Sequence, residues 1–147
     1  MKSLRPAASL LLVLASPAWA SLGQPAASIA SDQQRLGGER RTIAADAYSV
    51  EEITSASGTV VREFVSPAGQ VFAVSWRGPV RPDLRPLLGE HFAALPRASA
   101  AGGRRGRPLV VHTDALVVES GGHVRDFRGR AFLPALMPEG VSPAAVR

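Results

Sequence analysis

Histidine and carboxylate side chains gather late in the chain, in a pattern that could serve a metal ion. The stretch contains His112, Asp114, Glu119 and His123. A zinc site needs three or four nitrogen, oxygen or sulfur ligands that converge on one point at about 2.0–2.3 Å. The spacing of these residues is not diagnostic of such a site, so we interpret the histidines as exposed residues at strand ends and expect no cofactor. His112, Asp114 and His123 remain the candidate metal ligands.

A hydrolytic arrangement is conceivable in the same stretch. Ser120 and His123 would be neighbours across a turn at Gly121-Gly122, but Asp126 would face away from them. The sequence has no nucleophile elbow and no obvious loop for an oxyanion hole. We therefore assign no catalytic residue. A small envelope hydrolase, or a metal-binding protein that uses the His112–His123 region, is kept as an alternative function.

Arginine side chains form the other cluster with chemical potential. The candidate anion-binding residues are Arg104, Arg105, Arg107, Arg125, Arg128 and Arg130. Guanidinium groups bind carboxylates and phosphates in a fork geometry. The first three lie in a glycine-rich stretch, 96–108, which predicts a flexible loop. A polyanion-binding protein that uses the Arg104–Arg107 loop is a second alternative, while a solvated loop without a ligand is the preferred interpretation.

The start of the chain predicts export. Lys2 and Arg5 precede an apolar run from Ala7 to Ala15, and the small-residue pattern Ala18-Trp19-Ala20 follows. This is the pattern of a secretory signal peptide over residues 1–20. Its removal would lower the formal net charge from +5 to +3. We expect a periplasmic or extracellular protein that is not transmembrane after cleavage and does not bind nucleic acid.

Cysteine is absent from the sequence. Disulfide bonds, thiol chemistry and iron–sulfur ligation are therefore excluded. In an oxidising compartment, the stability of this chain would have to come from packing alone.

Three antiparallel strands are predicted between Tyr48 and Trp76, joined by turns at Ser55–Gly58 and Ser66–Gly69. The first turn predicts Glu52 opposite Arg62, Val50 opposite Phe64 and Thr54 opposite Val60. A bulge at Gly69 in the second turn predicts Phe64 opposite Phe72, Arg62 opposite Val74 and Val60 opposite Trp76.

One face of this meander is the expected core. It would carry Tyr48, Val50, Glu52, Val60, Arg62, Phe64, Phe72, Val74 and Trp76. The other face is mixed and contains Glu51 opposite Glu63. Because like charges that face each other are unfavourable when buried, we expect that face to be at least partly solvated.

Helical periodicity appears on both sides of the meander. Ser28–Leu36 predicts a short helix that stops at Gly37, and Asp83–Leu95 predicts the main helix, with leucines on one side. A second β region, 109–133, is expected to form a hairpin around Gly121-Gly122, and a proline-rich tail follows. The predicted fold class is α+β, an antiparallel meander and hairpins packed against one main helix. The expected divisions are the signal peptide (1–20), an N-terminal segment (21–47) and one domain (48–147).

Several segments resemble an uncharacterised bacterial family, domain of unknown function 2844. They are RLGG (35–38), YSVEEITSASGTVVREFVSPAGQVFAVSWRGP (48–79), DLRPLLG (83–89) and LVVESGGHVRDFRGRAFLPALMPEGV (116–141). The resemblance implies a small exported protein with no assigned catalytic residues. Together with the absence of a convergent catalytic or ligand set, it favours a non-enzymatic binding or interaction module, with an envelope protein or an anionic surface as partner.

Overall fold

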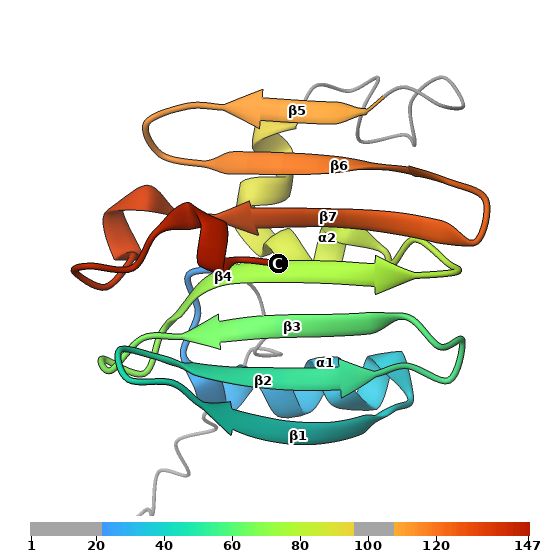
Figure 1. Ribbon diagram of the computed structural model, residues 1–147, viewed down its shortest axis with the longest axis horizontal. Coiled ribbons are helices and arrows are strands. Elements are labelled where there is room, and N and C mark those ends of the chain that lie inside the picture. Colours follow the sequence, from blue (N-terminus) through green and yellow to red (C-terminus); the bar gives the residue numbers. More distant parts are fainter. Residues whose placement is uncertain (1–21, 96–107) are drawn as a thin grey trace, which may run out of the picture.

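One antiparallel sheet organises the chain (Figure 1). In the computed structural model, which describes residues 22–95 and 108–147, seven strands are hydrogen-bonded in the order β1-β2-β3-β4-β7-β6-β5. The strands are β1 (Glu39–Ala44), β2 (Ser49–Thr54), β3 (Val60–Val65), β4 (Val71–Gly78), β5 (Leu109–His112), β6 (Val117–His123) and β7 (Asp126–Phe132). The predicted α+β fold class is confirmed.

The sheet consists of two meanders joined along its middle. Strands β1 to β4 follow one another by local turns, and β5 to β7 form the second series. The last strand of each series pairs with the other, from Ala73 opposite Phe132 to Gly78 opposite Phe127. Strand β1 lies in the stretch before the predicted meander and forms its own antiparallel ladder with β2.

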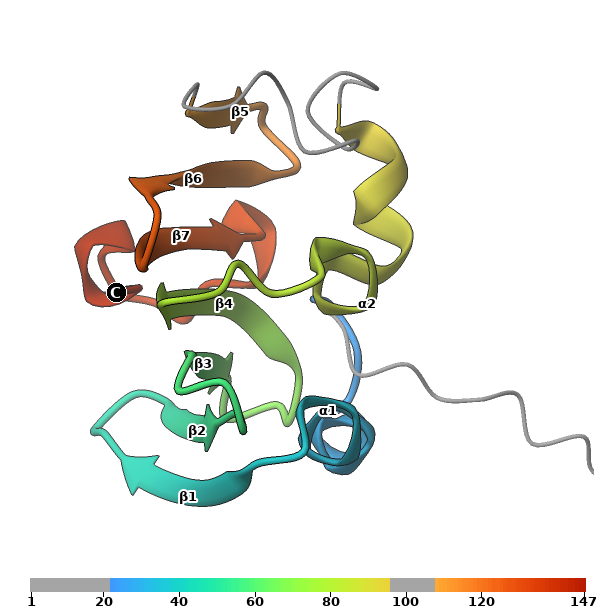
Figure 2. The ribbon, with the colours of Figure 1, turned by 90° about the vertical axis from the view of Figure 1, so that its right-hand side faces the viewer.

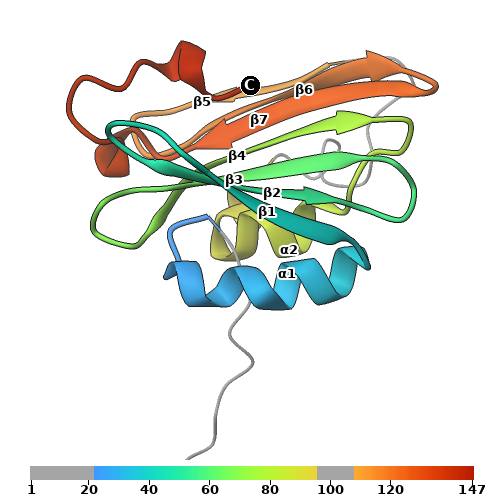
Figure 3. The ribbon, with the colours of Figure 1, turned by 60° about the horizontal axis from the view of Figure 1, so that its bottom comes forward.

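Both helices cover the same face of the sheet (Figures 2 and 3). Helix α1 (Ile29–Leu36) lies behind the first strands and ends at Gly37, whose φ of 62° is left-handed. Helix α2 (Leu84–Leu88) begins at Asp83, which accepts a hydrogen bond from the Arg85 amide at 2.9 Å. The predicted helix to Leu95 is α-helical only in this part, because Gly89 leaves the helical conformation and a 3-10 segment, Gly89–Ala94, follows.

The helix-covered face contains two apolar clusters. Under α1, Ile29 packs with Ile53, Val65 and Val71. Under α2, the leucines at 84, 87 and 88 pack with side chains from the centre of the sheet, namely Val61, Val74, Trp76, Val118 and Ala131. Each helix therefore secures one half of the sheet.

The opposite face, here called the open face, has its own apolar cluster. It consists of Val50, Phe64, Phe72, Ala73, Phe132 and Val146. The C-terminal segment brings Val146 onto this face, where it is fully buried. Figure 2 shows the C-terminal turns on the side of the sheet away from the helices. The tail therefore covers the centre of the sheet on the open face.

The predicted register is right on one side of β3 and wrong on the other. All three pairs predicted between β2 and β3 are confirmed. The turn at Ser66–Gly69 also has the expected geometry, with Gly69 at a φ of 77° and Val65 opposite Val71. The register then shifts by one residue at Phe72, so that Phe64 lies opposite Ala73 and Val61 opposite Trp76.

This additional bulge changes the predicted core. Phe64 and Phe72 share the open face, with ring centroids 6.1 Å apart, whereas Val74 and Trp76 turn to the helix face. The prediction that the two phenylalanines and the tryptophan share one face is therefore wrong. The expected solvation of the other face is also wrong, because α1 covers it and buries both Glu51 and Glu63.

The turn between β6 and β7 lies three residues beyond its predicted position. Gly121 and Gly122 are within β6, and His123 pairs with Asp126 across Val124-Arg125. Arg125 takes the left-handed backbone conformation itself, with a φ of 71°. Arg128 and Arg130 lie within the regular part of β7.

Candidate anion-binding groove

A groove of about 900 Å³ lies between the C-terminal segment and the sheet. Its wall includes Val146 and Arg147 of the tail, and its floor and opposite side come from β3, β4, β7, β6 and the start of β5. The arginines that line it are Arg62, Arg77, Arg128, Arg130 and Arg147. Among the described residues that line the groove, Glu119 is the only one with an acidic side chain.

Alternation along each strand places these side chains in two rows that cross the open face. One row contains Arg62 of β3, Ser75 of β4, Arg130 of β7, Glu119 of β6 and Val110 of β5. The neighbouring row contains Val60, Arg77, Arg128 and Gly121, again in the order of the strands. Positive charge is therefore concentrated on β3, β4 and β7, whereas β6 and β5 contribute mostly uncharged residues.

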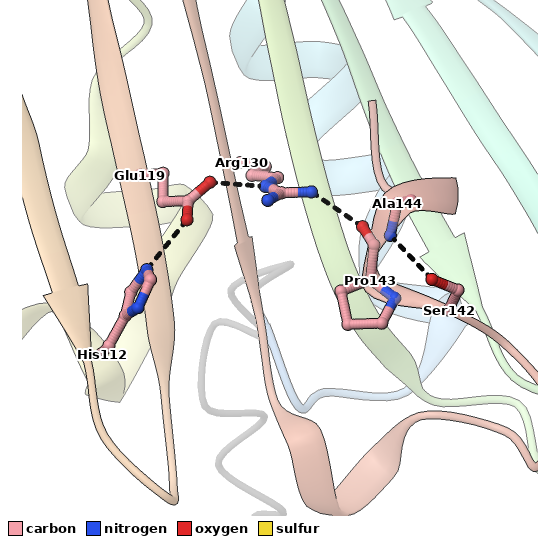
Figure 4. A network of polar contacts seen from close by, with 6 residues as sticks. All are labelled: His112, Glu119, Arg130, Ser142, Pro143 and Ala144. Carbon is pink, nitrogen blue, oxygen red and sulfur yellow. Dashed lines mark hydrogen bonds and ion pairs between the residues drawn. The ribbon is translucent and has the colours of Figure 1, made fainter.

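Arg62 and Arg130 hold the tail against the sheet. The Arg130 Nε donates to Glu119 at 2.7 Å, and its Nη1 donates to the Pro143 carbonyl at 2.8 Å (Figure 4). Arg62 has a similar arrangement, donating to Glu52 at 2.7 Å and to the main-chain oxygen of Arg147 at 3.2 Å. Both guanidinium groups are thus used by the fold.

The two carboxyl groups that bind the anchoring arginines, those of Glu119 and Glu52, have lowered pKa values. A hydrogen bond from Arg130 outweighs the effect of partial burial and, with a second bond from His112, holds the pKa of Glu119 below its usual value. Burial raises the pKa of Glu52, but the hydrogen bonds from Arg62 and Arg41 outweigh it and lower the pKa overall. Each acid therefore neutralises an anchoring arginine.

Arg77 and Arg128 differ from the anchoring arginines. They lie directly opposite each other on β4 and β7, and their side chains are 70% and 63% exposed. Asp126 approaches both, with closest N–O distances of 3.7 Å and 3.6 Å, which are too long for good hydrogen bonds. This arginine pair has the features of a site for an external anion.

The anion-binding candidates from the sequence fall into three groups. Arg128 and Arg130 line the groove, whereas Arg125 lies exposed at the β6–β7 turn and is not part of the lining. Arg104, Arg105 and Arg107 lie outside the described residues, so their role stays a prediction. Arg62 and Arg77 were missed, because only the pairing of β4 with β7 brings them beside Arg128 and Arg130.

The candidate metal ligands are spread along β6. His112 pairs with Val117 at one end of this strand, and His123 is at the other end, about 20 Å away. His112 contacts Glu119 at 2.8 Å (Figure 4), and Asp114 is in the loop between β5 and β6. Among residues 22–95 and 108–147, no group of three or more His, Cys, Asp or Glu could hold a metal ion.

The residues considered for hydrolysis also take other positions than expected. Asp126 faces His123 directly, and the side chain left apart is Ser120, which pairs with Gly129. The Ser120 hydroxyl is buried and has no hydrogen-bond partner in the described part of the chain. The arrangement therefore does not connect Ser120 with His123.

Comparisons with known proteins complete the description. In the described residues, no helix has the length and apolar character needed to cross a bilayer. No curated protein matches the chain, and no solved structure does. Residues 18–146 match a family described as "Protein of unknown function (DUF2844)", which covers most of the sequence, including the whole sheet and both helices. The chain belongs to this family, DUF2844.

Proposed function

We propose that this protein is an exported, non-enzymatic binding protein that holds an anionic group between Arg77 and Arg128. The observation that carries the proposal is the direct opposition of these two exposed arginines across β4 and β7. Like charges placed opposite each other destabilise a sheet. Asp126 relieves this repulsion only from 3.6–3.7 Å, so an anion bound between the guanidinium groups would complete the site.

The chemistry and size of the groove agree with this role. Guanidinium groups bind carboxylate and phosphate oxygens with paired, charge-assisted hydrogen bonds. A volume of about 900 Å³ lies in the range of small-molecule sites. The neighbouring arginines, Arg62 and Arg130, are already held by carboxylates and main-chain oxygens of the tail. Their charges are balanced by Glu52 and Glu119, which leaves Arg77 and Arg128 as the arginine pair available to an external anion.

Export is part of the proposal. The first residues have the charged start, apolar run and small-residue cleavage pattern of a signal peptide. The family match begins at residue 18, after the charged start and the apolar run. In a periplasmic or extracellular setting, the anion would be a small metabolite, a lipid headgroup or an acidic group on an envelope component.

The proposal is tested by calorimetric titration with inorganic phosphate at low salt. Replacing Arg77 or Arg128 by Gln should weaken binding at least about tenfold, because each change removes charge-assisted hydrogen bonds. Arg41→Gln is the matched control, since Arg41 is on the same face, is also 70% exposed and is not part of the groove. Binding that is absent, or that weakens equally in all three variants, would contradict the proposal.

A further inference from the structure

We infer that the ligand of this groove is an anionic amphiphile, with its charged head between Arg77 and Arg128 and its apolar part lying across Gly121 toward Val110. The inference rests on the proposed function and names the class of ligand. It follows from how charge, exposure and side-chain size change along the groove from β4 to β5.

The groove is charged at one end and apolar at the other. Beyond Arg128, the same row continues with Gly121 on β6 and reaches Pro108, whose Cβ would lie 3.7 Å from a Cβ added to Gly121. Val110 on β5 is 60% exposed, one of the few large apolar side chains exposed in the described residues. From β4 to β5 is three strand spacings, or about 14 Å, which leaves room for an extended chain.

Gly121 keeps this path open. It has no positive φ, and an added Cβ would meet Pro108 only at ordinary van der Waals distance. The backbone therefore does not require glycine at this position. Because Gly121 has no side chain, the groove stays unfilled between Arg128 and Val110, where a larger residue would occupy it.

A linear polyanion fits the groove less well than an amphiphile. Repeated negative groups would need cations along the whole length, but the exposed arginine pair is confined to β4 and β7. Farther along, such a ligand would meet the carboxylate of Glu119, which is ionised. An apolar chain has no charge to repel there and would cover Val110.

The test compares three probes by calorimetry: dodecyl phosphate, ethyl phosphate and dodecyl maltoside. The two dodecyl compounds are kept below their critical micelle concentrations. Dodecyl phosphate should bind at least about a hundredfold more tightly than ethyl phosphate, because burial of even part of the chain is strongly favourable. The uncharged dodecyl maltoside should bind at least about tenfold more weakly than dodecyl phosphate, because it lacks the anion. Far-ultraviolet circular dichroism before and after each titration confirms that the protein stays folded.

Variants separate the two ends of the groove. Gly121→Val should remove most of the preference for dodecyl over ethyl phosphate, because the added side chain would fill the path of the apolar chain. Val110→Ser should reduce that preference severalfold, whereas Val80→Ser should have no effect. Val80 is the matched control because it is 52% exposed and is not part of the groove.

The outcomes distinguish the inference from the proposed function. If ethyl and dodecyl phosphate bind equally and both depend on Arg77, the amphiphile is overturned and the anion site stands. If neither phosphate binds, both fail. If the protein binds only to anionic lipid vesicles and not to monomeric dodecyl phosphate, it recognises a charged surface and the inference is overturned.

Discussion

Asp32 of α1 and Glu63 of β3 form a pair of buried carboxyl groups beneath the helix. Their carboxyl groups are almost fully buried, with 1% and 2% of the residues exposed, and Glu51 lies directly opposite Glu63. Burial, with a hydrogen bond to Asp32 and its negative charge, raises the pKa of Glu63 to about 9. Protonated Glu63 can therefore donate to Asp32, which also contacts Arg35 at 2.6 Å.

This pair predicts that stability falls as the pH rises from about 5 to 8. In that window the folded protein keeps the proton on Glu63, whereas an unfolded glutamate, with a pKa of about 4.3, has lost it. The folded state binds more protons, so the free energy of unfolding decreases with increasing pH. Glu52 and Glu119, whose pKa values are lowered, titrate below this window. Urea unfolding at several pH values measures the slope.

Glu63→Gln is the decisive variant for this pair. The amide can donate to Asp32 at every pH, so the variant should lose most of the pH dependence and be at least as stable as the wild type at pH 8. Glu52→Gln is the matched control, because Glu52 is on the neighbouring strand but has a lowered pKa. The unfolding free energy of Glu52→Gln should change with pH as steeply as that of the wild type. If the slope of Glu63→Gln also equals that of the wild type, Glu63 is not protonated in the folded protein.

Trp76 and Gly129 give a second prediction, on packing. Trp76→Ala should cost about 3–5 kcal/mol of unfolding free energy, because the side chain is 2% exposed and packs in the cluster under α2. Gly129→Ala should also destabilise, since its Cβ would clash with the Trp76 indole and crowd the Glu119 carbonyl. In a double-mutant cycle, Gly129→Ala should lower the free energy of unfolding by less in the Trp76→Ala background than in the wild type. Strictly additive costs would show that the indole does not require this glycine.

Local sequence signals predicted the parts of the fold that depend on local structure. The turn chemistry around Gly58 and Gly69 identified both hairpins of the first meander and the β2–β3 register. The bulge at Phe72 has no such signal, because no glycine or polar residue marks it, and it moved Trp76 to the other face. Burial of Glu51 and Glu63 depends on where α1 packs, which the thin apolar content of the helix did not reveal.

The candidate site was less predictable than the fold, because it depends on contacts between distant segments that leave no local signal in the sequence. Arg128 and Arg130 were singled out by their residue type, but the arginine pair exists only because β7 docks on β4. That contact joins segments about fifty residues apart in the sequence. No local pattern specifies it, so Arg77 could not be recognised as part of the groove.

Arg125 provides a third prediction. At a φ of 71° an L-residue other than glycine is strained, and asparagine tolerates this region better than most residues. Arg125→Asn should therefore raise the free energy of unfolding by about 0.5–1 kcal/mol, and Arg125→Val should lower it. Thermal unfolding ranks the stability of the two variants. If Arg125→Val is at least as stable as Arg125→Asn, the turn does not adopt this conformation in solution.

Export yields a fourth prediction. If the first twenty residues are a signal peptide, protein recovered from the cell envelope or the medium should begin at Ser21. Intact-mass spectrometry distinguishes this form from the full chain directly. A full-length mass in the exported fraction would show that the apolar run is retained, and a purely cytoplasmic protein would contradict export.

Val146 gives the final prediction, which links the tail to the groove. It is fully buried against the open-face cluster, while Arg62 and Arg130 hold neighbouring main-chain oxygens of the tail. Val146→Ser should lower the free energy of unfolding by about 1.5–3 kcal/mol, the worth of a buried valine. Val80→Ser, at an exposed position, should change it by less than about 0.5 kcal/mol.

Because Val146 and Arg147 form one wall of the groove, Val146→Ser should also weaken phosphate binding under conditions in which it is still folded. Unchanged stability would show that the tail is not docked, and normal stability with lost binding would place its role in the ligand site alone.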